Sequence, residues 1–289
     1  MLTVHVLGRP ESYLEDQTPV VPPTPMGETI YYYLVCERQP VTHAHVANLF
    51  WSDMTTSEAL AEWHTLLPTL HNAFGAYLKS TADQVAFNYQ MDHRVDLYDL
   101  QYILLDDKIP ARQKLEKIRT LYRGALLAET EERKDTDFGQ WLHQHRQAIQ
   151  RRVGEALQGL TEYFLQQDDF VFGFKTTRWW LTLEPGNEVA HRLRMNLFWR
   201  SKQRSAALLQ YHICRSELDN YFGSEPSAQT TELYLQILHE AVPGAPTRRA
   251  RANRIANPDL HNLPRRLTSF AGREKEIAAL HRYLLEEKQ

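Results

Sequence analysis

The fold class of this chain is decided by LTLEPGNEVAHRLRMNL, residues 181–197, and by ALLQYHICRSEL, residues 207–218. In both segments apolar residues recur three and four positions apart, which is the spacing of a helix with one buried face. The pair Pro185-Gly186 ends a helix, because proline and glycine interrupt helical structure. The same pattern of apolar helices and short turns extends over residues 95–242. The sequence therefore predicts an all-α helical array there.

Residues 1–94 combine strands with helices. Residues 2–8 alternate in side-chain character and end in glycine, which is typical of a strand. Thr24-Pro25 predicts a helix start, because a capping hydroxyl precedes a proline at the first helical position. This helix is expected to run through Val35, and a second, shorter helix is expected at residues 43–50.

A third helix is predicted to begin at Thr55. Glu58 stands at capping-box spacing from it, and apolar residues continue at helical spacing as far as Phe74. Gly75 ends the helix, and residues 77–89 then predict a β-hairpin. Strand, three helices and hairpin are the order of a winged helix. The predicted fold class is therefore mainly α, with an N-terminal α+β winged helix followed by an all-α helical array.

Charge is distributed unevenly along the 289 residues. The net charge is -3, but residues 1–95 carry four Lys/Arg against ten Asp/Glu, whereas residues 243–289 carry ten against five. The first segment is thus acidic and the last is basic. No apolar run approaches the roughly 18 residues that span a bilayer, and the N-terminus lacks a signal-peptide pattern. Cys36 and Cys214 are accordingly expected to be free thiols in a reducing cytoplasm.

No motif for catalysis or nucleotide binding occurs in the sequence. It contains neither a P-loop nor a dinucleotide-binding, serine-hydrolase or zinc-protease signature. Histidines form the close pairs His43/His45 and His143/His145. No cysteine or carboxylate cluster completes a ligand set around either pair, as a transition-metal site would need. We therefore expect no enzyme activity, no cofactor and no metal site.

An ordered set of segments resembles the bacterial transcriptional activator domain of SARP-type (antibiotic regulatory) transcription factors. Besides the two segments above, the set comprises VDLYDL (95–100), LYRGALLAE (121–129), QWLHQHR (140–146) and FGSEPSAQTTELY (222–234). The resemblance implies a tetratricopeptide-like array over residues 95–242. It also implies contact with RNA polymerase, with another regulator protein or with a second copy of the chain. Within these segments, Trp141 and Arg146 are expected to pack the repeats and to join the winged helix to the array.

Both ends of the chain carry further resemblances. WSD, residues 51–53, precedes the third helix and resembles the OmpR-type domain that lies before the activator module in such regulators. The winged-helix domain is therefore expected at residues 1–94. Residues 243–262 are predicted to form a basic linker. Residues 263–289 resemble the lead-in to a STAND-type nucleotide-binding domain, although no phosphate-binding loop follows it in this sequence.

In a winged helix the third helix enters the major groove of DNA. Here that helix contains no Lys or Arg, carries Glu58 and Glu62, and holds Pro68, which removes a backbone donor and is expected to kink the helix. Neutralisation of phosphates supplies most non-specific affinity, so an acidic domain is poorly equipped for DNA. Polar side chains can still hydrogen-bond to bases or phosphates. The candidate DNA-binding residues are His64, Thr65, Thr69, His71, Asn72, Lys79 and Arg94.

Candidate protein contacts come from aromatic and arginine residues, which are common interface anchors. Residues 31–33 are three consecutive tyrosines, and consecutive helical residues cannot all face one core, so some should be exposed or meet another domain. The candidate protein-interaction residues are Tyr32, Trp179, Arg146, His191 and Arg192. The last three are alternatively expected to hold polar contacts between winged helix and array.

Two functions of different classes follow. In the first, a transcriptional regulator binds promoter DNA through the winged helix and recruits RNA polymerase or a partner through the array, with no bond made or broken. In the second, a protein-interaction module descended from such a regulator no longer binds DNA. The order of the two domains favours the first function, whereas the acidic charge of residues 1–95 and Pro68 favour the second.

Overall fold

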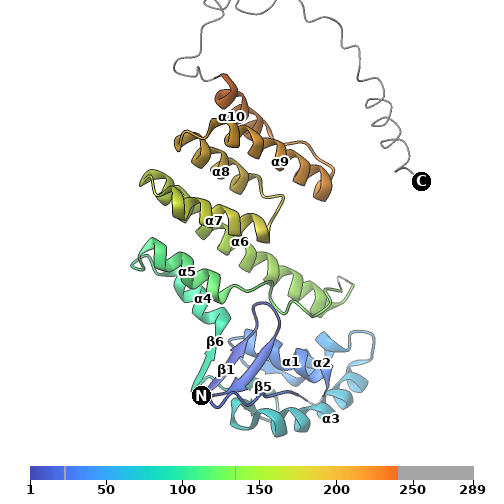
Figure 1. The fold of residues 1–289 in the computed structure, drawn as a ribbon. Coiled ribbons are helices and arrows are strands. Elements are labelled where there is room, and N and C mark those ends of the chain that lie inside the picture. The colour runs from blue at the N-terminus through green and yellow to red at the C-terminus, as the bar shows by residue number, and fades with distance from the viewer. Residues whose placement is uncertain (23, 134, 240–289) are drawn as a thin grey trace, which may run out of the picture. The chain divides into compact units, whose positions relative to one another are not determined.

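The computed structural model describes residues 1–22, 24–133 and 135–239, which belong to one unit (Figure 1). The predicted basic linker (243–262) and the predicted lead-in (263–289) lie outside the described residues.

Short strands and α-helices alternate in the N-terminal region. The helices are α1 (Pro25–Cys36), α2 (His43–Phe50) and α3 (Thr56–Phe74), followed by the 3-10 turn η1 (Gly75–Tyr77). The strands are β1 (Leu2–His5), β2 (Glu11–Leu14), β3 (Val41–Thr42), β4 (Leu78–Ser80), β5 (Gln84–Phe87) and β6 (His93–Val95). This element order is the one predicted from the sequence, with β2, β3 and β6 added.

The strands form two separate three-stranded sheets, with orders β2-β1-β6 and β3-β5-β4. In the first, β1 pairs antiparallel with β2 and parallel with β6, which places Val4 opposite Val95. In the second, β4 and β5 form the predicted hairpin, with Leu78 opposite Phe87. The sequence did not predict β2, β3 or β6, of which β3 and β6 pair with strands distant in the chain.

Local capping fixes the predicted helix starts. Thr24 Oγ1 accepts the backbone N–H of Gly27 at 3.1 Å, which begins α1. At α3, Thr55 Oγ1 accepts the N–H of Glu58 and the Glu58 carboxylate accepts the N–H of Thr55, so the predicted capping box is confirmed. The helix passes through Pro68 without a break and ends at Phe74.

The helical array follows directly from β6. Its helices are α4 (Asp96–Leu105), α5 (Ala111–Leu121), α6 (Asp137–Gln166), α7 (Phe170–Leu183), α8 (Glu188–Arg200), α9 (Arg204–Phe222) and α10 (Ala228–His239). Helices that follow one another pack together, as α6 does on α7 and α8 on α9 (Figure 1). The predicted fold class is confirmed: the chain is mainly α, with a small N-terminal α+β region before a helical array.

Two other features of the described residues bear on the sequence predictions. Cys36 and Cys214 are free thiols, as expected. Among the residues that the structure describes, no helix combines the length and the apolar character that crossing a membrane requires.

The three consecutive tyrosines of α1 are all buried, each with at most 2% of its surface exposed. Tyr31 stacks on Phe74 of α3, and the hydroxyl of Tyr32 lies 3.5 Å from Ser12 Oγ of β2. Tyr33 meets Phe50 of α2 and, from the array, rings of α6. The prediction that Tyr32 is a surface contact for a partner is therefore wrong, because α1 is enclosed on every side that carries a tyrosine.

The helix α6 contributes to the attachment of the array to the N-terminal region. Its residues Phe138 and Trp141 both pack against Tyr33, and Trp141 Nε1 donates a 2.8 Å hydrogen bond to Glu37 at the end of α1. Farther along, α6 packs on α7 and α8. One helix therefore belongs to both regions, and Trp141 has the joining role that was predicted for it.

A buried carboxylate provides a second attachment. Asp96, the first residue of α4, is 3% exposed, and its two oxygens accept the backbone N–H groups of Val6 (2.9 Å) and Leu7 (3.1 Å). Arg123 Nη2 and His5 Nδ1 lie at 3.5 and 3.3 Å from the same carboxylate. Asp96 thereby accepts hydrogen bonds from two backbone N–H groups that lie just after the end of β1 and are buried away from water.

We expect Asp96→Ala to lower the free energy of unfolding by about 3 kcal/mol, because two buried N–H groups lose their acceptor. Asp99→Ala on the same helix is the control. Asp99 pairs with the exposed Arg94, so its loss should cost about 1 kcal/mol or less. Urea denaturation of both variants measures the difference, and equal losses would contradict the structural role of Asp96.

Alkaline pH should destabilise the fold through α1. Burial raises the pKa of Tyr32 to about 12, from an ordinary value of 10.0. Above pH 10 the unfolded chain loses a proton that folded Tyr32 keeps, so the free energy of unfolding falls as pH rises towards 12. Tyr32→Phe should make this fall shallower, whereas Tyr102→Phe, which removes an exposed hydroxyl, should not. Thermal denaturation across this pH range checks the expectation.

Candidate DNA and protein interfaces

The outward face of α3 carries the predicted base-contacting residues. His64, Thr65 and Asn72 are exposed, whereas Thr69 and His71 are half-buried. The opposite face is buried: Trp63 is fully enclosed, and its Nε1 donates to His43 Nδ1 at 2.8 Å. The structure therefore brings the five α3 candidates onto or beside one accessible helix face.

Two of these candidates already use their hydroxyl hydrogens. Thr65 Oγ1 donates to the carbonyl of Ala61 at 2.9 Å, and Thr69 Oγ1 donates to the carbonyl of Leu66 at 2.7 Å. Each hydroxyl can then only accept a hydrogen bond, as from a base amino group. Phosphates offer no donor when ionised, so these threonines are unsuited to phosphate contact.

The cations of residues 1–95 are all engaged with other groups. Lys79 Nζ donates to Gln90 Oε1 at 2.5 Å, Arg38 donates to Gln101 Oε1 at 3.0 Å, and Arg9 lies 3.5 Å from a carboxylate of the array, that of Glu129. The fourth, Arg94, pairs with Asp99. These pairs are exposed and can exchange partners, but each phosphate contact would have to displace an existing one.

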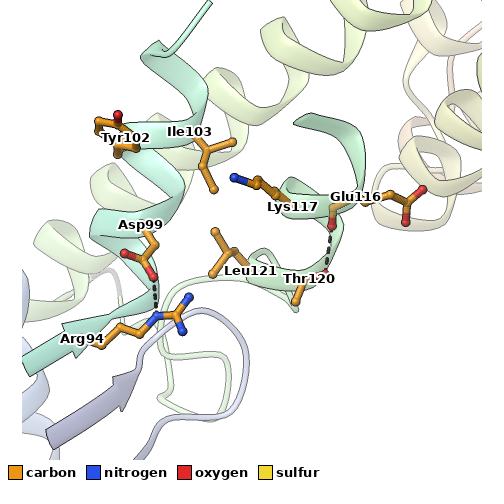
Figure 2. A pocket seen from close by; sticks show the side chains of 8 residues that line it. All are labelled: Arg94, Asp99, Tyr102, Ile103, Glu116, Lys117, Thr120 and Leu121. Atoms are coloured by element: carbon orange, nitrogen blue, oxygen red, sulfur yellow. Dashed lines mark hydrogen bonds and ion pairs between the residues drawn. The ribbon is translucent and has the colours of Figure 1, made fainter. Parts of the chain in front are cut away.

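Figure 2 shows the hollow that Arg94 borders, where β6 meets α4 and α5. Its volume is about 390 Å³, and the Arg94 Nε donates to Asp99 at 2.7 Å, which raises the pKa of Arg94. Arg94 belongs to the sheet of β1, whereas Lys79 belongs to the hairpin sheet. The structure thus does not place these two candidates on one strand pair. The hollow is lined by Arg94, Asp99, Tyr102, Ile103, Glu116, Lys117, Thr120 and Leu121.

The side chain of Arg146, a candidate interaction residue on α6, forms its hydrogen bonds within the protein. Its guanidinium donates to the carbonyls of Leu126 (2.8 Å), Leu127 (2.6 Å) and Thr130 (3.0 Å), and it pairs with Glu132 at 3.2 Å. Hydrogen bonds from Arg146 and His143 lower the pKa of Glu132 although burial opposes this. Arg146 clamps the loop between α5 and α6, and the same loop bonds to the chain after β1.

His191 and Arg192 lie within the array and not at its joint with the N-terminal region. His191 is 1% exposed, and its ring nitrogens bond to the carbonyl of Pro185 (2.8 Å) and to the side-chain amide of Gln210 (2.7 Å). Arg192 donates to Thr230 Oγ1 at 3.0 Å. The alternative prediction, that these residues hold polar contacts at the joint, is wrong for both, because all of these partners belong to the array.

Besides the predicted Trp141, the joint depends on residues that sequence reasoning did not select. Glu37 accepts from Trp141, and the hydroxyls of Tyr89 and Tyr98 converge on the carbonyl of Val35. A tyrosine in a polar segment gives no sign of such a role, since its partner lies far away in sequence. Asp96 had one available signal, a carboxylate at the start of a predicted helix.

Trp179 is the candidate whose surroundings remain open to a partner. It is half-buried on α7, beside a hollow of about 630 Å³, with the Arg119 guanidinium 5.9 Å from its ring centre.

In the described ranges, no group of three or more His, Cys, Asp or Glu side chains is placed to hold a metal ion.

Comparison with known proteins adds two findings. Residues 104–238 match the family described as the bacterial transcriptional activator domain. The structure resembles that of Mycobacterium tuberculosis EmbR, solved in complex with a low-affinity phosphopeptide, with a TM-score of 0.61 and 17% identity. The likeness covers 88% of this chain and 69% of the EmbR chain. No curated protein matches the chain. The family match supports the predicted activator domain over the array, and the likeness to EmbR supports the fold.

Arg146→Ala should lower the free energy of unfolding by about 3 kcal/mol, because three carbonyls and Glu132 lose a buried charged partner. Arg151→Ala, on the exposed face of the same helix, should have little effect. Chemical denaturation of both variants tests this. An unchanged stability for Arg146→Ala would show that the residue is not a structural clamp.

Proposed function

We propose that this protein is a SARP-type transcriptional regulator that works by contact alone. The match of residues 104–238 to the bacterial transcriptional activator domain is the observation that carries this proposal. The α+β region before the matched segment supports it further, because α3 lies with one face buried and the other exposed, as a groove-reading helix requires.

In this proposal residues 1–94 form a winged-helix domain that binds promoter DNA in the cytoplasm. The exposed side of α3 enters the major groove, where His64, Thr65 and Asn72 meet base edges, and the β4–β5 hairpin brings Lys79 to the backbone. Because α3 has no cation of its own, affinity comes mainly from base contacts and little from phosphates.

The array supplies the second half of the proposed activity. Its attachment through α6 and Asp96 fixes its position relative to α3, so DNA bound on one region holds the array beside the promoter. The array then recruits RNA polymerase, another regulator protein or a second copy of the chain. Recruitment requires no chemical step, only simultaneous contact.

A non-DNA-binding interaction module is the second candidate, and one observation favours it. All four cations of residues 1–95 already have partners, and α3 presents Glu58 and Glu62. A domain with this charge repels the phosphate backbone at long range. The array would then be the whole functional surface.

DNA retention at two salt concentrations separates the two candidates. For the regulator, the purified chain should retain particular genomic fragments, with a slope of log affinity against log salt of only about -2, because at most Lys79 and Arg94 release counterions. Absence of retention even at low salt would reject DNA binding and leave the interaction module.

A matched pair of threonine variants locates the DNA surface. Thr65 of α3 and Thr182 of α7 are both exposed, and each donates its hydroxyl to the carbonyl four residues earlier at 2.9 Å. Thr65→Asp should reduce fragment retention by about tenfold or more, since a carboxylate would face the groove. Thr182→Asp introduces the same charge and the same local change on α7, so it should retain DNA as the unaltered chain does.

A further inference from the structure

One face of α7 remains uncovered by the rest of the described chain. Val171, Phe174, Lys175, Arg178, Trp179 and Thr182 recur at helical spacing and line a hollow of about 630 Å³, which Arg119 of α5 and Arg194 of α8 close at its sides. Val171 is 75% exposed and adds an apolar surface beside the ring of Trp179. We call this hollow the α7 groove.

The α7 groove concentrates positive charge. Its lining contains four cations and no carboxylate. The nearest acid is Glu116 of α5, which binds Lys175 at 2.5 Å and Arg119 at 3.4 Å. Arg178 has neither an ion pair nor a hydrogen bond from its side chain within the part of the chain that the structure describes. The internal carboxylates therefore leave a surplus of positive charge.

Arg194 is held in place by contacts within the array. The Arg194 guanidinium donates to Gln210 Oε1 (3.1 Å) and to Thr177 Oγ1 (3.2 Å), and it lies 5.7 Å from the ring centre of Phe174. Burial, and then the charge of Arg178, lower the pKa of Arg194. Arg119 Nε is buried without a hydrogen-bond partner. Pre-positioned cations lose little entropy when an anion arrives.

The groove continues beyond α7. A second hollow of about 270 Å³ shares Arg178, Thr182 and Arg194 with it and extends to Ile213 and Glu217 on α9, so the surplus of positive charge is confined to the α7 end. The combined surface crosses three successive helices. Such a length suits an extended or helical peptide segment better than a compact small molecule.

We propose that the α7 groove binds an acidic segment of a partner protein, with carboxylates on Lys175 and Arg178 and apolar side chains against Val171 and Trp179. The positive charge of the groove favours a negatively charged partner. The exposed apolar residues favour a polypeptide, whose side chains can pack against them. A DNA duplex fits less well, because it would contact the cations but offer nothing to the apolar lining.

This inference rests on the proposed function only for the statement that the array contacts a protein. It is independent of DNA binding, since none of the groove residues lies in residues 1–94. Loss of promoter binding would therefore leave it intact.

Fluorescence anisotropy with the full chain tests the proposal. The probe is a labelled random copolymer of glutamate and tyrosine, which samples many spacings of carboxylate and ring. A copolymer of lysine and tyrosine and a short DNA duplex are the comparison probes. The acidic copolymer should bind, and the basic copolymer should not.

Charge reversal in the groove should weaken that binding. Lys175→Glu and Arg178→Glu should each reduce affinity for the acidic copolymer by about tenfold or more. Arg151→Glu, an equally exposed charge reversal on α6, should leave it unchanged. Both groove residues are exposed, so the variants should fold, which circular dichroism verifies.

Three results would overturn the inference. The acidic copolymer could fail to bind, the groove variants could bind it as tightly as Arg151→Glu does, or the duplex could bind in its place with the same sensitivity to Arg178→Glu. The last result would assign the groove to nucleic acid. DNA retention by Thr65→Asp is a separate measurement, so failure of the proposed promoter binding remains distinguishable from failure here.

Discussion

The way the N-terminal region meets the array depends on how α1 is enclosed. Its three successive tyrosines point about a third of a turn apart, so each faces a different neighbour. Tyr31 contacts α3, Tyr32 contacts the sheet of β1, and Tyr33 contacts α6 of the array. One turn of helix thereby packs against α3, the first sheet and the array. Their combined burial makes the N-terminal region and the array share one hydrophobic core.

That shared core changes how the two proposed surfaces work together. A flexible linker between domains would let the array sample many positions relative to α3. Here the strand β6 leads directly into α4, and the carboxylate of Asp96 bonds back to the chain after β1. The face of α3 and the α7 groove are therefore held in one rigid relation. A regulator that recruits a partner gains from this, because the partner's position follows from that of the DNA.

Local structure was predicted correctly where a local signal existed. The start of α3 was visible in its capping box, and the polar candidates His64, Thr65 and Asn72 lie exposed on that helix. The predictions failed where burial decides the role. Tyr32 is an interface residue by type, yet it is enclosed, and His191 bonds within the array. Exposure depends on which elements pack together, and residue type alone does not contain that information.

The sequence by itself determined the mainly α class, the order of the elements, the helix starts and the acidic character of residues 1–95, because periodicity, capping and charge are local properties of a chain. Only the tertiary structure decided that β1 pairs with β6, that Glu37 meets Trp141, and that four cations from three helices surround one groove. Each of these contacts joins residues distant in sequence. Their formation is settled by which surfaces bury most apolar area together, and no local pattern encodes that choice.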